Sequence, residues 1–342
     1  MKIWLPTIRA RSGADVYAER LAQGLREHGA QSTVEWLPHT YQYTPWLLRK
    51  RLPPVGTDVI SVNSQIAFAF CHHYIPVVAT VLHCVAGRGY PQWKSLPQAI
   101  FHDQLVRRFE RASFRTASAI VAISDSTSRE VREDFGIHDV RTIPLWIDAK
   151  IFSPASERTS KESERTRVLI VGNMSRRKGG DLIAPFCNAL GKDFDVTVVT
   201  GLRSERPAVS ANGAGLRFAS GLNTEQLVDA YRNTDIVVSL SRHEGFGYTA
   251  LEGMACGKPV AAFNVSGLCD VIVEGETGLL VPVEDMEALA SACRTMREHP
   301  EVARAMGERG RERAITAFSA SRAIEAHLQL YSELLYESNT LR

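Results

Sequence analysis

The sequence has few cysteines, and none of them forms a recognisable pair. The six cysteines of the 342 residues are scattered, with no C-x-x-C pair and no spacing typical of zinc ligands. They are typical of buried thiols in a reducing compartment. Cys71, His72 and His73 do not predict a metal site either, because adjacent side chains on one element diverge.

Long apolar runs and a large net charge are also absent. The longest apolar run, around 75–86, is interrupted by His83 and is too short to span a bilayer. The segment Met1–Arg9 has too short an apolar core for a signal peptide. The formal net charge of +2 argues against a generally basic nucleic-acid binder. We therefore expect a cytoplasmic protein that does not bind nucleic acid.

Two common motifs are missing as well. No G-x-G-x-x-G fingerprint occurs, which argues against a dinucleotide oxidoreductase, and no aspartate-rich metal motif is evident. The hydrophobic content of 44% and the charged content of 23% are those of a globular protein, and the length favours two domains. Strands that alternate with helices predict parallel α/β sheets covered on both faces.

One stretch in the second half of the chain predicts a strand, a glycine-rich turn and a helix. The continuous apolar run Asp235–Leu240 is typical of a strand buried in a parallel sheet. Gly245 and Gly247 allow the backbone to come close to a ligand. A helix is expected from about Tyr248 until Gly257, and its positive N-terminal end favours an anion such as phosphate.

Two carboxylates lie on either side of this predicted anion site. Glu244 is in the turn, and Glu252 is about one turn into the helix. A carboxylate accepts hydrogen bonds from two neighbouring hydroxyls, which a sugar or a ribose offers. The combination indicates a nucleotide-sugar site.

The residues H-E-G-F-G-Y-T-A-L-E-G-M-A-C-G-K-P-V at 243–260 resemble the E-x7-E signature of retaining glycosyltransferase family 4. The family form is E-G-F-G-x-x-x-x-E-A-M-A-x-G-x-P-V, and the sequence departs from it mainly at Gly253. The resemblance covers nearly all of the chain. It implies the GT-B fold, an α/β architecture of two Rossmann-like domains whose parallel sheets face a central cleft.

The resemblance also implies the division of the chain. We expect a first, acceptor-binding domain at 1–153 and a nucleotide-sugar-binding domain at 167–317. A linker is predicted at 154–166, which is rich in Ser, Glu, Arg and Lys. The remaining segment, 318–342, is expected to form a helix that packs back onto the first domain.

The site residues are carried over from the family by position. Glu244, His83 and Lys178 are expected to be catalytic, with Glu244 on the donor sugar. Glu252 is expected to bind the ribose hydroxyls, and the cations are expected to bind the diphosphate. The remaining donor-binding residues are Arg177 with Arg176 as its substitute, Gly13, Phe246, Gly247, Tyr248 and Thr249. The loop that holds the cations matches V-G-R-x-x-x-x-K-G, with Asn173 in the position of the usual Arg.

Two of these residues lie in the first half of the chain. His83 ends the predicted strand at 77–82 and matches the T-x-H position beside the donor sugar, although a lone His at a strand end is more often structural. Gly13 is the remaining glycine of a family Gly-Gly pair, with Ser12 in the first position.

The resemblance implies transfer of a hexose from a GDP- or UDP-sugar to a hydroxyl of a saccharide or lipid-linked saccharide. The product is α-linked, and the pathway is polysaccharide or glycoconjugate biosynthesis. No metal and no cofactor besides the donor is expected. The alternatives are a non-catalytic sugar-nucleotide-binding subunit and a GT-B epimerase or phosphorylase.

Two basic segments allow two interpretations each. Trp46–Leu52 places apolar bulk beside three cations, and it fits either an anionic membrane surface or a core helix end with a solvated flank. The arginines at positions 107, 108, 111 and 115 either line an anionic acceptor groove or are solvated.

Overall fold

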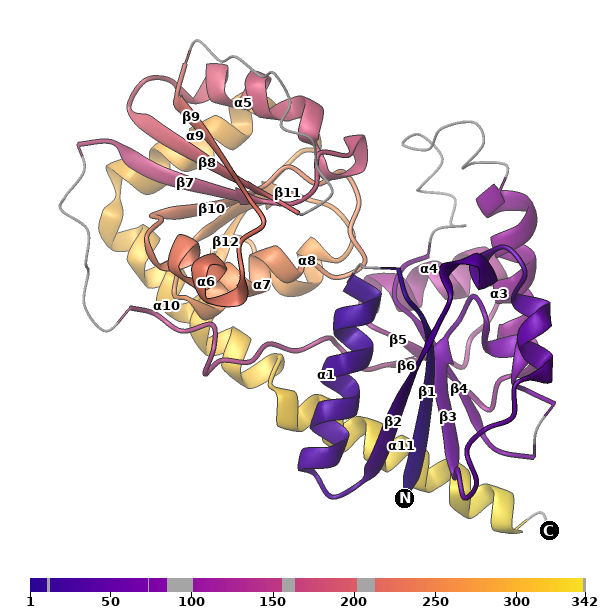
Figure 1. The fold of residues 1–342 in the computed structure, drawn as a ribbon. Helices are drawn as coiled ribbons and strands as arrows, with labels where there is room; N and C mark the ends of the chain where they lie inside the picture. The colour runs from indigo at the N-terminus through magenta and orange to yellow at the C-terminus, as the bar shows by residue number, and fades with distance from the viewer. Residues whose placement is uncertain (11–12, 73, 85–100, 156–163, 202–212, 341–342) are drawn as a thin grey trace. The chain divides into compact units, whose positions relative to one another are not determined.

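The computed structural model describes residues 1–10, 13–72, 74–84, 101–155, 164–201 and 213–340 (Figure 1). Ser12, His73 and most of the predicted linker lie outside these residues. The chain divides into two compact units, the first being Met1–Leu145 with Ala320–Arg342 and the second Trp146–Ser319. None of the described helices is both long and apolar enough to cross a membrane.

The first unit is a parallel sheet of six strands in the order β2-β1-β3-β4-β5-β6. The connections between its strands are mostly helical. In chain order its elements are β1 (Lys2–Ile8), α1 (Gly13–Glu27), β2 (Gln31–Leu37), the 3₁₀-helices η1 (His39–Gln42) and η2 (Pro45–Lys50), β3 (Val59–Asn63), the 3₁₀-helix η3 (Ala67–Ala69), β4 (Val77–Val81), the π-helical segment η5 (Phe101–Val106), α3 (Arg107–Thr116), β5 (Ala119–Ala122), α4 (Asp125–Phe135), β6 (Arg141–Thr142) and α11 (Ala320–Thr340).

The second unit is also a parallel sheet of six strands, in the order β12-β11-β10-β7-β8-β9. Its elements are β7 (Thr166–Val171), the 3₁₀-helices η6 (Arg176–Lys178) and η7 (Gly180–Leu182), α5 (Ile183–Leu190), β8 (Phe194–Thr200), β9 (Gly215–Ser220), α6 (Thr224–Arg232), β10 (Ile236–Ser239), α7 (Tyr248–Ala255), β11 (Val260–Phe263), α8 (Leu268–Val271), β12 (Gly278–Val281), α9 (Met286–Glu298) and α10 (Pro300–Ala317).

The apolar runs become the central strands of both sheets, which confirms the predicted α/β architecture. Every residue of β4, β10 and β11 is buried. A strand that is buried on both faces needs apolar side chains on both, so its sequence is continuous and does not alternate. This is why runs such as Val77–Val81 were sufficient to predict the strands.

The first unit ends at Leu145, earlier than the domain boundary predicted at 153. The segment after it packs on α6 of the second unit. The ring of Phe152 lies edge-on to Tyr231, with 6.1 Å between the ring centroids. Arg232 donates to the backbone oxygen and the hydroxyl of Ser153 at 2.9 and 3.0 Å. These contacts place the end of the predicted first domain in the second unit.

The last helix, α11, belongs to the first unit and lies against α1. Gly24 makes this approach possible, because a Cβ there would meet the Ile324 side chain at 2.5 Å. Below this contact is a buried polar row. His327 lies 3.4 Å from the hydroxyls of Tyr17 and Tyr331, and Tyr331 donates to Ser61 at 3.1 Å.

His327 makes the stability of this packing depend on pH. Burial lowers the pKa of His327 to about 4 from an ordinary value of 6.5, so the folded unit holds a neutral imidazole. As pH falls from 6.5 to 4, the unfolded chain gains a proton that the folded chain excludes. The free energy of unfolding should therefore fall over this window, by about 3 kcal/mol at most.

Hydrogen exchange of the backbone amides of α1 and α11, measured from pH 7 to 4, reports the stability of the first unit alone. His327→Gln should remove most of the pH dependence, because Gln does not ionise. Equal pH profiles for the wild type and this variant would contradict the assignment.

Candidate functional site

The candidate site lies at the carboxyl edge of the second sheet, where the order of the strands reverses. From β7 the chain adds β8 and β9 on one side, and then β10, β11 and β12 on the other. The loops that follow β7 and β10 therefore leave neighbouring strands in opposite directions. In open α/β sheets this arrangement leaves a crevice between the two loops, and ligands bind there.

The loop after β7 is held close to the end of β10. The Ser175 side chain caps the 3₁₀-turn of Arg176–Lys178 by accepting from the Lys178 amide. Gly179 follows with φ +73°, and a Cβ at this position would lie 2.2 Å from the Leu240 carbonyl oxygen. Both the positive φ and the short distance to Leu240 require a glycine at this position. The close approach brings the basic turn to the loop after β10.

Glu244 is the centre of the contacts between the two loops. Its side chain is almost fully buried, and the residue is only 7% exposed. Lys178 Nζ and the Ser241 hydroxyl both donate to Oε1, the latter at 2.7 Å. The Arg177 guanidinium lies 3.7 Å from Oε2 and also donates to the His243 carbonyl at 3.0 Å.

These neighbours keep the Glu244 carboxylate charged. Burial by itself raises its pKa, but the charges of Lys178 and Arg177 and the hydrogen bonds from Lys178 and Ser241 lower it below its ordinary value. At neutral pH Glu244 is therefore an acceptor of hydrogen bonds.

Arg242 also joins the two loops, next to this cluster. Its guanidinium is buried and donates two bonds to Asp181, at 2.6 and 2.9 Å, and one to Glu284. Its backbone amide donates to the Arg177 carbonyl at 2.8 Å. A planar guanidinium has the donors in a fixed fork that suits such a three-way contact. Arg242 thus fixes Arg177 and Lys178 relative to Glu244.

Glu252 lies on α7 and is held by a buried tyrosine. The Tyr231 hydroxyl donates to Glu252 Oε2 at 2.8 Å. Burial, together with the charge of Glu252, raises the pKa of Tyr231 well above its usual value, so the hydroxyl remains a donor. This hydrogen bond fixes the orientation of the Glu252 side chain.

The N-terminus of α7 has no side chain that caps it. The helix begins after Gly247, which has φ +101° and makes no side-chain cap hydrogen bond. The first amides of Tyr248 and Thr249 are therefore directed toward the carboxyl edge of the sheet, as an anion site requires.

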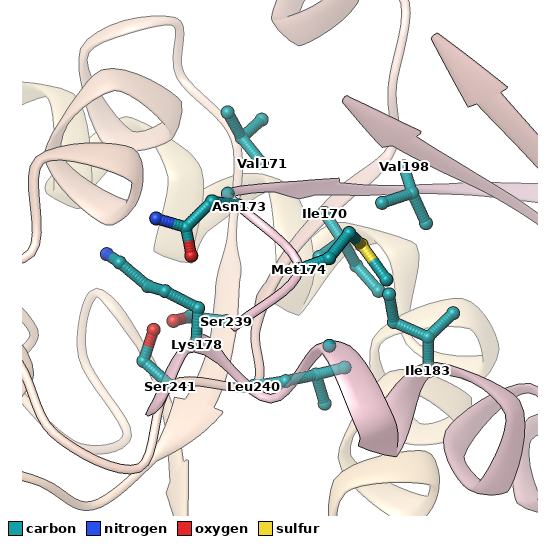
Figure 2. Close-up of a pocket in the computed structure, with 12 residues that line it drawn as sticks. Ile170, Val171, Asn173, Met174, Lys178, Ile183, Val198, Ser239, Leu240 and Ser241 are labelled. Carbon is teal, nitrogen blue, oxygen red and sulfur yellow. The ribbon is translucent and has the colours of Figure 1, made fainter. Parts of the chain in front are cut away.

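A small pocket lies between the ends of β7, β8 and β10 (Figure 2). The centre of a water molecule can occupy about 10 Å³ of this pocket. The pocket therefore has room for one ordered water. Figure 2 shows polar residues on one side and apolar residues on the other. The polar side is Asn173, Lys178 and Ser241, and the apolar side is Met174, Ile183 and Val198. Lys178 therefore also contributes to the wall of this pocket.

The structure brings together Glu244, Arg177 and Lys178 among the predicted residues. Arg176 does not face Glu244, since its side chain is 71% exposed and lies 4.0 Å from Asp181. The ring of Phe246 is buried against Tyr248 and Phe318, so only its backbone can take part in binding.

The other two predicted residues belong to the first unit. Gly13 begins α1 after β1, and His83 follows the end of β4. Both lie after strands of a parallel sheet, at the edge where such sheets bind ligands.

Three further residues of the site were not predicted from the sequence. Tyr231 ends a helix without any motif of its own, and nothing local indicates its contact with Glu252. Arg242 and Ser241 lie two and three residues before the predicted Glu244, so their position in the motif was the available signal. The partners of Arg242, Asp181 and Glu284, lie in loops far away in the sequence, whereas Ser241 donates to Glu244 itself.

Comparison with known families identifies the class of this protein. Residues 153–313 match the model of the family described as Glycosyl transferases group 1, and residues 35–151 match that of Glycosyltransferase Family 4. The chain belongs to the family 4 glycosyltransferases, which confirms the resemblance found in the sequence.

Among curated relatives, D-inositol 3-phosphate glycosyltransferase of Nocardiopsis dassonvillei is 29% identical over 253 residues, which are 67% of this chain and 57% of the relative. MMP alpha-(1->4)-mannosyltransferase of Mycolicibacterium hassiacum is 25% identical over 268 residues, which are 71% of this chain and 62% of the relative. The chain thus spans somewhat more than half the length of these relatives.

Solved structures show the same fold. Sucrose-phosphate synthase from Thermosynechococcus elongatus superposes with a TM-score of 0.85 at 21% identity, over 98% of this chain and 100% of that one. HepE from Anabaena in complex with UDP-glucose superposes with a TM-score of 0.77 at 16% identity, over 97% of this chain and 100% of that one. The fold is that of the GT-B glycosyltransferases.

The Arg242 contacts predict a specific loss of stability. Arg242→Gln removes the charge that holds Asp181 and Glu284 and should lower the free energy of unfolding by about 2 kcal/mol. Arg242→Lys keeps the charge but lacks the fork of donors, so its free energy of unfolding should lie between those of the wild type and Arg242→Gln. Denaturant unfolding measures these differences.

Arg297→Gln is the matched control, because Arg297 forms a surface ion pair with Asp193 at 3.8 Å in the same unit. Its cost should stay below about 0.5 kcal/mol. If Arg242→Gln costs no more than the control, Arg242 does not hold the loops.

Proposed function

We propose that this protein is a retaining hexosyltransferase. It moves a hexose from a UDP- or GDP-sugar to a hydroxyl of a saccharide or lipid-linked saccharide and forms an α-linked product. The observation that carries the proposal is the buried Glu244 carboxylate between two cations at the reversal point of the second sheet. A cytoplasmic role in polysaccharide or glycoconjugate biosynthesis is part of the proposal.

The two carboxylates suit the two polyhydroxyl parts of such a donor. Glu244 is charged and accepts hydrogen bonds, so it can bind hydroxyls of the transferred sugar. Glu252 is held by Tyr231 and would bind the ribose hydroxyls. The complex of HepE with UDP-glucose supports a donor of this class for the same fold.

The cations suit the diphosphate, which gains negative charge as the glycosidic bond breaks. Lys178 and Arg177 pair with Glu244 in the structure, and we expect the diphosphate to share them once the donor binds. The amides at the start of α7 would add to this stabilisation of the leaving group. These groups supply the positive charge that a metal provides in other transferases, so we propose metal-independent transfer.

We assign Glu244 a role in binding the donor sugar and not the role of a nucleophile. Its Oε1 is held by Lys178 and Ser241, and its pKa is lowered, which makes it a weak nucleophile. We propose that the departing diphosphate takes the proton of the acceptor hydroxyl on the same face of the sugar, which retains the configuration. We propose that His83 and Gly13 also take part in donor binding.

Donor binding is the first test. Thermal unfolding should be measured with UDP, GDP, UDP-glucose and GDP-mannose. A ligand at a hundred times its dissociation constant adds about 2.7 kcal/mol to the stability of the folded state. Glu252→Gln and Lys178→Gln should abolish the shift, while Glu298→Gln, an exposed change on α9 of the same unit, should keep it.

Three outcomes distinguish the proposed hexosyltransferase from the alternative functions. Transfer of the sugar from the nucleotide that shifts the wild type supports the proposal. Binding without transfer to any acceptor in a saccharide and lipid-saccharide panel indicates a binding subunit or an epimerase. An equal shift in the wild type and Lys178→Gln would contradict the assigned site.

Tyr231 provides a second test, which isolates the ribose contact. Tyr231→Phe keeps the buried ring but removes the hydrogen bond to Glu252. Nucleotide binding should weaken about fivefold to tenfold, because the carboxylate loses the donor that orients it. Isothermal titration calorimetry gives the affinity.

Tyr336→Phe serves as the control, since that hydroxyl is exposed on α11. An unchanged nucleotide affinity in Tyr231→Phe would exclude a dependence of ribose binding on this hydrogen bond.

A further inference from the structure

The connection between β2 and β3 exposes large apolar side chains beside cations. Trp46 is 46% exposed, Leu47 48% and Leu52 78%. Arg49, Lys50 and Arg51 lie among them and are exposed as well. We call these six residues the basic–apolar surface. It lies on the first unit.

The 3₁₀-geometry of η2 explains why these residues point outward. Residues three apart share one face of a 3₁₀-helix. Pro45 and Leu48 share the buried face of η2. Trp46 and Arg49 share a second face, and Leu47 and Lys50 share the third. Trp46 and Leu47 therefore each have a cation one turn further along the same face.

A row of aromatic rings supports this surface. The ring of Trp46 lies 6.2 Å from that of Phe109 on α3, and Phe109 stacks on Phe68 at 5.5 Å. Tyr43, also exposed, lies 5.3 Å from Phe101. These contacts attach η2 to α3 and Tyr43 to η5, so the exposed rings are part of a packed layer.

The neighbouring helix α3 adds charge of the same sign. Arg108, Arg111 and Arg115 are exposed on it, and Leu105 is exposed on the adjoining η5. The one carboxylate of α3, Glu110, faces the interior and accepts from Ser64 at 3.1 Å. The exposed charged side chains of η2 and α3 are therefore all cations.

We propose that the basic–apolar surface binds the face of an anionic lipid bilayer. Trp and Tyr rings suit the headgroup level, where one end is apolar and the other is wet. The cations are attracted by the anionic headgroups. A protein partner fits less well, because the cores of protein interfaces are depleted of charge, and of Lys in particular.

Co-sedimentation with vesicles tests the proposal without any need for a donor or an acceptor. The full chain is mixed with vesicles of phosphatidylcholine alone or with phosphatidylglycerol added. Binding should require phosphatidylglycerol and weaken at high salt, which screens the cations. Trp46→Ser with Leu47→Ser, and separately Arg49→Gln with Lys50→Gln, should each weaken partition at least about tenfold.

Two pairs of exposed residues in the second unit serve as matched controls. Val302→Ser with Ile315→Ser changes apolar residues that are 45% and 41% exposed, and Lys192→Gln with Arg304→Gln removes two exposed cations. Neither pair should alter binding.

Three results would overturn the proposal. The first is no binding to phosphatidylglycerol vesicles, and the second is equal binding by the Trp46 and Leu47 variant and the wild type. The third is a change in sedimentation velocity in that variant without any change in vesicle binding, which would assign the surface to self-association. Each result leaves the donor-binding tests unaffected.

Discussion

The pairing of Lys178 and Arg177 with Glu244 is the constraint on which the rest of the site depends. A carboxylate that is almost fully buried is costly unless positive charges and hydrogen bonds compensate it. The cations come from the loop after β7 and the carboxylate from the loop after β10. The site therefore exists only because β7 and β10 are neighbours in the sheet, where the order of strands reverses.

Backbone geometry and one further arginine keep these loops in register. Gly179 allows the basic turn to lie against the end of β10, where any side chain would meet the Leu240 carbonyl. Arg242 then bridges Asp181 and Glu284. Preorganised charges of this kind need no rearrangement when charge develops on a leaving group, which is the usual source of electrostatic catalysis. The stability of the loops and the proposed chemistry thus share the same contacts.

Sequence reasoning succeeded where a feature depends on neighbouring residues alone. The buried strand at 77–81 and the start of a helix at Tyr248 follow from a run of apolar residues and from glycines in a turn. The domain boundary was less predictable. Trp146–Ser153 looks like the end of the first domain in the sequence, but it joins the second unit because Phe152 packs on Tyr231.

The sequence by itself determined the α/β architecture, the family and the positions of Glu244, Glu252 and Lys178, because the motifs that carry them are local. Only the tertiary structure decided that Arg177 faces Glu244 while Arg176 is exposed, and that Tyr231 holds Glu252. The physical reason is that these contacts join segments that strand order brings together. A local pattern determines the conformation of each segment, but it does not specify which distant side chain meets it.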